Sequence, residues 1–209
     1  MKLLVIGATR GIGRCLVDYA LEEGHEVTAL VRKPDQLDRD TSRLTVVRGD
    51  ILDAASVSRS LEGQDAVCTT IGIGPTRQPV MVFSEGIRIV IAAMQATGAH
   101  QLACITGIGA GDSKHHGGFF YDKIINPLLL KTRYADKDRE EAVVRASDVE
   151  GVIVRPGILT NGPLTVQYRV ITDLSGITAG KISRKDVAHF VLGELAEKKY
   201  VRQTPLLTY

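Results

Sequence analysis

The chain has 209 residues, 44% of them hydrophobic and 24% charged, and its 26 lysines and arginines nearly balance 24 aspartates and glutamates. This composition is typical of one globular domain with a full hydrophobic core, and it excludes collagen-like, disordered and disulfide-scaffold proteins. The formal net charge of +2 and an aromatic content of 5% argue against binding along a nucleic-acid backbone or stacking on single strands, so no nucleic-acid partner is expected.

The cysteines, the histidines and the first apolar run each exclude a class of protein. Cys15, Cys68 and Cys104 are odd in number, far apart and set in apolar stretches, which is typical of free, buried thiols in a reducing compartment. The histidines lack the spacing of metal ligands, so no metal site is expected. The apolar run at residues 3–6 is too short for a signal peptide or a membrane helix. We therefore expect a cytoplasmic protein with no membrane partner.

The apolar pattern at the start of the chain predicts a strand, a helix and a second strand. Residues 3–6 form a continuous apolar run followed by glycine, as in a strand buried on both faces. Residues 12–20 keep helical spacing up to Gly24, a natural C-terminal cap, and residues 26–31 return to a strand pattern. Residues 1–31 therefore predict one βαβ unit.

The same alternation continues along the chain. Further strands are predicted at residues 44–47, 66–71, 102–106 and 152–155. Helices are predicted at residues 54–61 with Asp53 as N-cap, at 83–94 ending near Gly98, around 139–146, and after Ser183, which is followed three residues later by Asp186. The alternation predicts an α/β fold, a Rossmann-like doubly wound parallel sheet with helices on both faces, in a single domain over residues 1–209.

Two regions depart from this pattern. Residues 107–130 are rich in glycine, and residues 157–182 mix Gly, Pro and Thr with short β-like pieces. Insertions after the carboxyl ends of strands form the walls of the ligand crevice in doubly wound sheets, so these two regions predict an apolar substrate crevice. Residues 124–130 are apolar enough for either core or interface, which leaves a monomer and a small homo-oligomer both open.

A glycine-rich turn follows the first predicted strand and opens the first predicted helix. A tight turn and the close approach of a diphosphate both require residues without a Cβ, and a helix N-terminus offers free N–H groups and a positive dipole end. The strand–turn–helix context makes this a dinucleotide-binding fingerprint. The residues of this turn that are expected to bind the cofactor are Gly7, Thr9, Arg10, Gly11, Ile12 and Gly13.

The end of the second predicted strand indicates which dinucleotide is bound. NAD enzymes usually carry Asp or Glu there, whereas this chain has Arg32 and Lys33. A guanidinium grips a 2′-phosphate that a carboxylate would repel, and Arg10 in the glycine turn is placed to reach the same phosphate. The expected cofactor is therefore NADP(H). For Lys33 the alternative is an ordinary solvated loop charge.

The ends of the third and fourth predicted strands supply the remaining cofactor contacts. Asp50 is placed to accept from the adenine amino group and Ile51 to cover the ring. The alternative for Asp50 is a turn aspartate that bonds its own backbone. Ile71, Gly72 and Ile73 follow the fourth strand, where small residues let the nicotinamide ribose pass close to the backbone.

With these residues the sequence resembles the short-chain dehydrogenase/reductase superfamily in its atypical, NAD(P)H-binding branch. The resemblance rests on Gly7-x-x-x-Gly11-x-Gly13, Leu30-Val31-Arg32, Gly49-Asp50-Ile51-Leu52 and Val154-Arg155-Pro156-Gly157. Two later segments are similar to the C-terminal part of the biliverdin-IXβ/flavin reductase group: Gly162-Pro163-Leu164-Thr165…Tyr168 and Ile182-Ser183-Arg184-Lys185-Asp186-Val187-Ala188. Arg155 is expected to shape the end of the sixth strand rather than to contact substrate.

The resemblance implies an NADPH-dependent reductase whose cofactor lies across the carboxyl edge of the sheet. The usual catalytic group of the superfamily is Ser–Tyr–Lys, with the tyrosine four residues before the lysine. Here Thr106 stands where the serine after the fifth strand would be. Tyr134 precedes Lys137 by three residues and Tyr121 precedes Lys123 by two, so neither pair has the spacing of the family.

Chemistry is still possible, because hydride transfer from a nicotinamide depends mainly on positioning and electrostatics. Lys137 would bond the nicotinamide ribose and hold positive charge near a developing oxyanion or reduced flavin, and Thr106 would orient the carboxamide or the substrate oxygen. Tyr134 would share a helix face with Lys137. These three are the catalytic candidates. The alternatives are a surface ion pair within the charged residues 136–141 for Lys137, and part-buried rings with wet hydroxyls for Tyr134 and Tyr121.

The predicted function is that of an NADPH-dependent oxidoreductase acting on a small-molecule substrate, a small planar carbonyl, quinone or flavin-like acceptor. The altered Tyr/Lys spacing keeps open a non-catalytic redox sensor that binds NADP(H). A sugar-nucleotide epimerase fits less well, since it normally needs a Tyr-x-x-x-Lys pair and a larger C-terminal domain.

Overall fold

Side chains of the first strand alternate between two hydrophobic clusters, one on each face of the sheet. In the computed structural model, Leu3 and Val5 of β1 (Lys2–Ile6) pack into one hydrophobic cluster, and Leu4 and Ile6 pack into another. Successive side chains of a strand point to opposite faces of the sheet, so a continuous apolar run requires cover on both faces. The structure describes residues 1–37, 41–74, 76–119 and 121–209.

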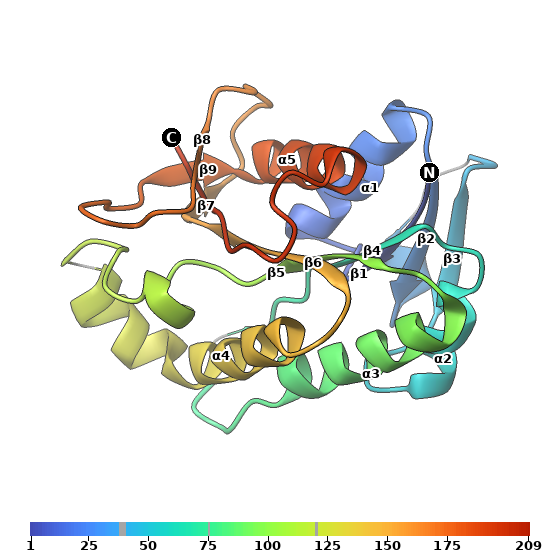
Figure 1. Ribbon diagram of the computed structural model, residues 1–209, viewed down its shortest axis with the longest axis horizontal. Coiled ribbons are helices and arrows are strands. Elements are labelled where there is room, and N and C mark those ends of the chain that lie inside the picture. The colour runs from blue at the N-terminus through green and yellow to red at the C-terminus, as the bar shows by residue number, and fades with distance from the viewer. Residues whose placement is uncertain (38–40, 75, 120) are drawn as a thin grey trace.

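The central sheet has eight strands in the order β3-β2-β1-β4-β5-β6-β10-β8 (Figure 1). Neighbouring strands are parallel, except that β10 and β8 are antiparallel. The remaining strands are β2 (Glu26–Val31), β3 (Leu44–Arg48), β4 (Ala66–Thr69), β5 (Gln101–Ile105), β6 (Glu150–Pro156), β8 (Arg169–Ile171) and β10 (Leu206–Thr208), and β7 (Ile158–Thr160) pairs with β9 (Lys181–Ser183) in a small second sheet. The predicted Rossmann-like doubly wound sheet is confirmed.

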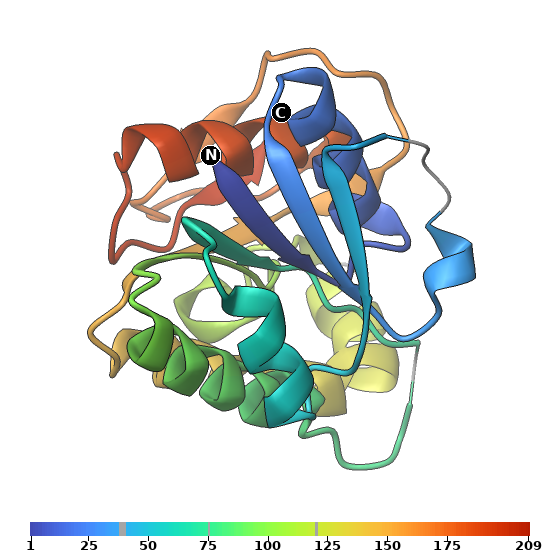
Figure 2. The ribbon, with the colours of Figure 1, turned by 90° about the vertical axis from the view of Figure 1, so that its right-hand side faces the viewer.

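Helices cover both faces of this sheet (Figures 1 and 2). α1 and α5 bury their apolar residues in the cluster that contains Leu3 and Val5, while α2 and α3 pack in the cluster that contains Leu4 and Ile6. α4 lies beside α3 on that second face. The helices are α1 (Gly11–Glu22), α2 (Ala54–Leu61), α3 (Val82–Thr97), α4 (Lys131–Arg145) and α5 (Arg184–Glu197), with shorter helical segments η1 (Pro34–Gln36), η2 (Gly111–Ser113) and η3 (Tyr121–Leu130).

The predicted helix caps are present. Asp53 accepts a hydrogen bond from the N–H of Ala55 at the start of α2, and Ser183 accepts one from the N–H of Asp186 at the start of α5. Gly98 ends α3 in the left-handed conformation, with φ of 78°. These local signals fixed three helix ends because each cap satisfies backbone groups within a few residues.

Two predicted elements have different bounds in the structure, and one strand was not predicted. The fourth strand ends at Thr69 rather than 71, because Thr70 turns its hydroxyl back to the first strand. The helix predicted around 139–146 is α4, which begins at Lys131. The strand β10 was not predicted, since three residues are too few to show a period.

The cysteines are free, with Cys68 and Cys104 buried and Cys15 half-buried. Within the part of the chain that the structure describes, no helix combines the length and the apolar character needed to cross a bilayer.

Candidate functional site

The glycine turn lies at the carboxyl end of β1, between β1 and α1. Gly7 and Gly11 have φ of 95° and 64°, in the left-handed region that favours glycine. A Cβ on Gly13 would overlap both the Thr70 side-chain oxygen and the carbonyl oxygen of Gly7. The turn therefore needs glycine for its backbone conformation at two positions and for close packing at the third.

Thr70 supports this turn and was not identified from the sequence. Its N–H donates to the Ile6 carbonyl at 2.9 Å, and its hydroxyl lies 3.1 Å from the Ile6 carbonyl oxygen and 3.2 Å from that of Gly7. A threonine after a short strand carries no signal by itself. Only the pairing of β4 with β1 brings it under the glycines.

Removing the Thr70 hydroxyl should weaken the turn. In Thr70→Val we expect the free energy of unfolding to fall by about 1–2 kcal/mol, because the carbonyls of Ile6 and Gly7 lose a donor. Affinity for the dinucleotide should fall with it. Urea unfolding and calorimetry measure the two effects, and Thr70→Ser, which keeps the hydroxyl, should stay close to wild type. Equal behaviour of the valine and serine variants would contradict this role.

The N-terminus of α1 is open to an anion. Arg10 occupies the N-cap position in an extended conformation, and its side chain makes no capping hydrogen bond. The first N–H groups of a helix have no intrahelical partner and carry the positive end of the helix dipole. The start of α1 thus presents hydrogen-bond donors and partial positive charge to an anion, and the first turn of this helix contains no carboxylate.

The cationic candidates gather at this same edge of the sheet. Arg10 is exposed, and its guanidinium lies 3.5 Å from the carbonyl oxygen of Gly72 in the loop after β4. Arg32 and Lys33 follow β2, which pairs in parallel with β1, and both are exposed. Parallel pairing places their loop at the carboxyl edge beside the glycine turn.

The two residues predicted after β3 to contact adenine both have partners within the protein. One carboxylate oxygen of Asp50 accepts from the N–H of Leu52 at 3.0 Å, which is the turn interaction considered as the alternative. The prediction for Ile51 was wrong, because this side chain is buried against Gly86 of α3 and cannot cover a ligand ring. Leu52, one residue further along, is 50% exposed at the same turn.

The loop after β4 leaves its backbone accessible. Ile71 and Ile73 are half-buried, and a Cβ on Gly72 would meet no atom within 4 Å. Packing within the chain therefore does not require glycine at this position. The open backbone fits the predicted close approach of a ribose.

Thr106, directly after β5, is tied to a buried ionic cluster. Its hydroxyl donates to Glu141 Oε1 at 2.9 Å. Arg155, fully buried in β6, donates to both oxygens of Glu141 at 2.9 and 2.6 Å and pairs with Asp112 of η2. These carboxylates raise the pKa of the Arg155 guanidinium despite its burial. The structure thus agrees that Arg155 shapes the end of β6.

Lys137 lies inside the protein rather than on a charged surface, so the surface ion pair considered for it is wrong. Its side chain is 8% exposed, and Nζ donates to the Ile105 carbonyl at 2.9 Å and pairs with Glu140 at 2.7 Å. Nζ also lies 4.0 Å from the centre of the Phe83 ring. Burial raises the pKa of the Glu140 carboxyl, and Lys137 opposes that rise.

Asp136 of α4 is buried because its carboxylate has partners on another helix. Asp136 is fully buried and accepts from the N–H groups of Phe83 and Ser84 at 2.9 and 3.4 Å, and from the Ser84 hydroxyl at 2.5 Å. It thereby caps α3 from outside that helix.

The two candidate tyrosines bond to each other. The hydroxyls of Tyr121 and Tyr134 are 2.7 Å apart, and Tyr121 donates to the Ile108 carbonyl at 2.9 Å, so Tyr134 donates to Tyr121. Burial raises the pKa of both phenols, that of Tyr134 well above its ordinary value. The pair lies under the loop after β5, where a Cβ on Gly107 would come within 3.0 Å of the Tyr134 hydroxyl. Neither phenol is a free proton donor here.

The two regions predicted as crevice walls meet each other. The His116 ring nitrogen lies 2.8 Å from the Ile177 carbonyl oxygen, and the N–H of Ala179 donates to the His116 carbonyl at 2.7 Å. Ile108 and Ala179 share a small hydrophobic cluster. Phe120, inside the first wall, lies outside the described residues. Exposed apolar side chains of the two walls are Phe119, Ile124, Leu128, Ile158, Leu164 and Val166.

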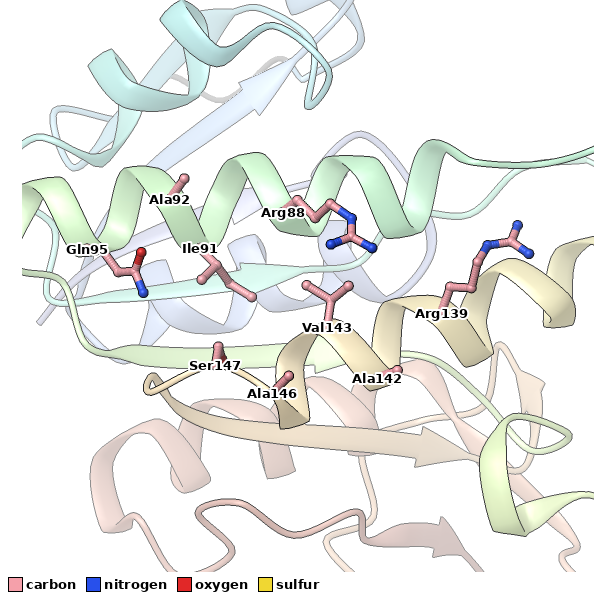
Figure 3. Close-up of a pocket in the computed structure, with 9 residues that line it drawn as sticks. All are labelled: Arg88, Ile91, Ala92, Gln95, Arg139, Ala142, Val143, Ala146 and Ser147. Carbon is pink, nitrogen blue, oxygen red and sulfur yellow. The ribbon is translucent and has the colours of Figure 1, made fainter.

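A separate groove of about 440 Å³ lies between α3 and α4 (Figure 3). Its lining includes Arg88, Ile91 and Val143, and none of the predicted site residues. It follows the two helices rather than the loops at the carboxyl edge of the sheet, so we do not assign the cofactor to it.

Comparison with known proteins points to one family. A family model described as NAD(P)H-binding matches residues 7–198. The uncharacterized sugar epimerase YhfK of Bacillus subtilis (strain 168) is 28% identical over 204 residues, which are 95% of this chain and 89% of that protein. The 3-beta-hydroxysteroid dehydrogenase of Mycolicibacterium neoaurum is 30% identical over 173 residues, which are 76% of this chain but 45% of that protein.

Solved structures share the fold over the whole chain. ChuY, an anaerobillin reductase from Escherichia coli O157:H7, superposes with a TM-score of 0.81 at 22% identity, covering 100% of this chain and 97% of its own. A short-chain dehydrogenase/reductase from Veillonella parvula DSM 2008, solved in complex with NADP, gives a TM-score of 0.84 at 16% identity, covering 100% and 94%. At these identities the likeness shows the shared fold alone.

Proposed function

The chain belongs to the NAD(P)H-binding family, and we propose that it is an NADPH-dependent reductase that transfers a hydride to a small planar carbonyl, quinone or flavin-like acceptor. The main observation in favour of this proposal is the glycine turn. The Thr70 hydroxyl is hydrogen-bonded to it, and the N-terminus of α1 that follows it has no side-chain cap. The anaerobillin reductase among the structural neighbours of the chain favours the same reaction class. The free buried thiols Cys68 and Cys104 fit a reducing cytoplasm, where we place the activity.

In this proposal the cofactor supplies the hydride, and the protein binds and orients both reactants. Gly7, Gly11 and Gly13 allow the diphosphate to approach the backbone, and Arg32 with Arg10 holds the 2′-phosphate. The open backbone at Gly72 accommodates the nicotinamide ribose.

Lys137 and Thr106 retain hydrogen-bonding capacity at the carboxyl end of β5. An ammonium has three donors, and two of those on Lys137 are used by Ile105 and Glu140, which leaves one for a ribose hydroxyl or a reduced acceptor. The Thr106 hydroxyl donates to Glu141 but can still accept from a carboxamide. Tyr134 then holds the crevice wall of residues 107–130 in place through its bond to Tyr121, and it does not act as the general acid. We assign to water the proton that the acceptor takes up with the hydride.

The reductase proposal is tested by turnover. Purified protein with NADPH and a panel of flavins, quinones and dicarbonyls should oxidise the nucleotide, measured by the loss of NADPH absorbance. Oxidation that never exceeds the enzyme-free background with any acceptor class would overturn it.

The expected cofactor preference can be tested through Arg32. In Arg32→Asp the affinity for NADPH should fall by roughly 30-fold or more, because a charge-assisted bond to the 2′-phosphate is lost and a repulsive charge is added. Affinity for NADH, which lacks that phosphate, should change little. Calorimetry with both nucleotides measures the ratio. Lys33→Asp makes the same change of charge one residue away and tests whether Lys33 is only a solvated loop charge. An equal loss for both nucleotides would show that Arg32 does not discriminate between them.

A redox sensor is the second candidate, and one observation favours it. The hydroxyls of Thr106, Tyr121 and Tyr134 all donate to groups of the protein itself, as expected for a site that binds a dinucleotide without passing on a proton. Tight binding of oxidised and reduced NADP with equal affinity, and no turnover with any acceptor, would favour the sensor over the reductase.

A further inference from the structure

The first residue of α5, Arg184, lies beside the glycine turn. α1 and α5 pack against each other along one face of the sheet (Figures 1 and 2). Their N-terminal residues, Gly11 and Arg184, come together at its carboxyl edge. The Nε atom of Arg184 lies 3.9 Å from the position that a Cβ on Gly11 would occupy.

The Arg184 guanidinium is held beside Gly11 without being neutralised by an acid. One of its terminal nitrogens donates to the Asn161 side-chain oxygen at 2.7 Å, and among the described residues Arg184 forms no ion pair with a carboxylate. Its positive charge acts on the adjacent α1. Burial raises the pKa of the Cys15 thiol, and the charges of Lys185 and Arg184 oppose that rise. A guanidinium has five donors, so several remain for a ligand.

A half-buried arginine suits an anion better than a solvated one. Arg184 is of intermediate exposure as a residue, although its bond to Asn161 is open to solvent, whereas Lys185 next to it is exposed. Electrostatic attraction is stronger where water is partly excluded, and a fixed guanidinium loses less freedom on binding. Gly11 has no side chain to separate Arg184 from a group that lies on the turn.

We propose that Arg184 is a second cationic arm of the diphosphate site, reaching over Gly11 to the bridging phosphates of a bound dinucleotide. This inference rests on the proposed cofactor site and not on the identity of the acceptor. Through its bond to Asn161, Arg184 also joins the wall of residues 157–182 to the cofactor. Arg10 and Arg32 would bind the 2′-phosphate on the adenosine, which only NADPH carries, whereas Arg184 would bind the diphosphate, which NADPH and NADH both carry.

The test is calorimetric binding of NADPH, NADH and ADP-ribose to Arg184→Gln. All three ligands contain the diphosphate, so each should bind about tenfold more weakly, by the same factor, because one charge-assisted hydrogen bond is lost. Lys185→Gln removes the same charge one residue away and should change each affinity less than about twofold, as for a screened surface charge. Thermal unfolding followed by circular dichroism confirms that the variants are folded. Arg184→Lys, which keeps the charge, provides a second variant and should show a smaller loss that is again equal for the three ligands.

Three outcomes would overturn the proposal. Unchanged affinity of folded Arg184→Gln would make Arg184 a structural tie to Asn161. A loss confined to NADPH would place it at the 2′-phosphate, and a loss that spares ADP-ribose would place it at the nicotinamide. Failure of the wild-type protein to bind any of the three would instead remove the cofactor site itself. Binding without turnover leaves this inference intact while the reductase proposal fails.

Discussion

Arg155→Met should lower the free energy of unfolding by about 3–5 kcal/mol, because it leaves the Glu141 carboxylate buried without its main partner. Arg155 is fully buried, Glu141 is 1% exposed, and the two share a pair of short hydrogen bonds. Urea unfolding measures the loss. Methionine fills a similar volume, so a cavity contributes little to the expected effect.

Two further variants separate the buried charge from other causes. Arg145→Gln removes the half-exposed second cationic partner of Glu141 and should cost less than about 1 kcal/mol, as surface pairs do. The double variant Arg155→Met with Glu141→Leu should recover much of the stability, because no unpaired charge remains buried. A double variant as unstable as Arg155→Met would mean that packing, rather than the isolated carboxylate, dominates.

Gly13→Ala should reduce dinucleotide affinity by more than about tenfold, equivalent to losing at least one charge-assisted hydrogen bond. The new Cβ would overlap the Gly7 carbonyl oxygen, which belongs to the backbone and cannot rotate away. The turn or the start of α1 must then shift, and the N–H groups that face the diphosphate shift with it. Overpacking of this kind should also cost about 1–3 kcal/mol of stability.

The matched control for this variant is Gly193→Ala within α5. A Cβ there meets no atom within 4 Å, so the same substitution should keep dinucleotide affinity and raise stability by about 0.5–1 kcal/mol through helix propensity. Calorimetry and thermal unfolding compare the two variants. Wild-type affinity in Gly13→Ala would show that the turn tolerates a side chain and does not lie against the ligand.

Local chemistry made much of the fold predictable from the sequence. The glycine turn, the caps at Asp53 and Ser183, and Gly98 each act within a few residues of the chain, so their patterns can be read directly. Apolar runs of four to six residues predicted the parallel strands, because a buried strand needs cover on both faces.

The parts that were missed depend on partners far along the chain. α4 has few apolar residues at helical spacing, and it is buried because Asp136, Lys137 and Glu141 find partners on α3, β5 and β6. Thr70 supports the glycine turn only through the pairing of β4 with β1. Ile51 was misassigned because the sequence does not show that Gly86 leaves room for it in the core.

The bonds between His116 and the segment around Ile177 also bear on how new specificities could be made from this scaffold. A chimera that imports one loop from a homologue would break the shared cluster of Ile108 and Ala179 and leave its remaining half without cover. Both loops would have to be exchanged together, as a single cassette, for the graft to fold. Natural divergence in acceptor choice should accordingly show paired changes at these two distant stretches of sequence.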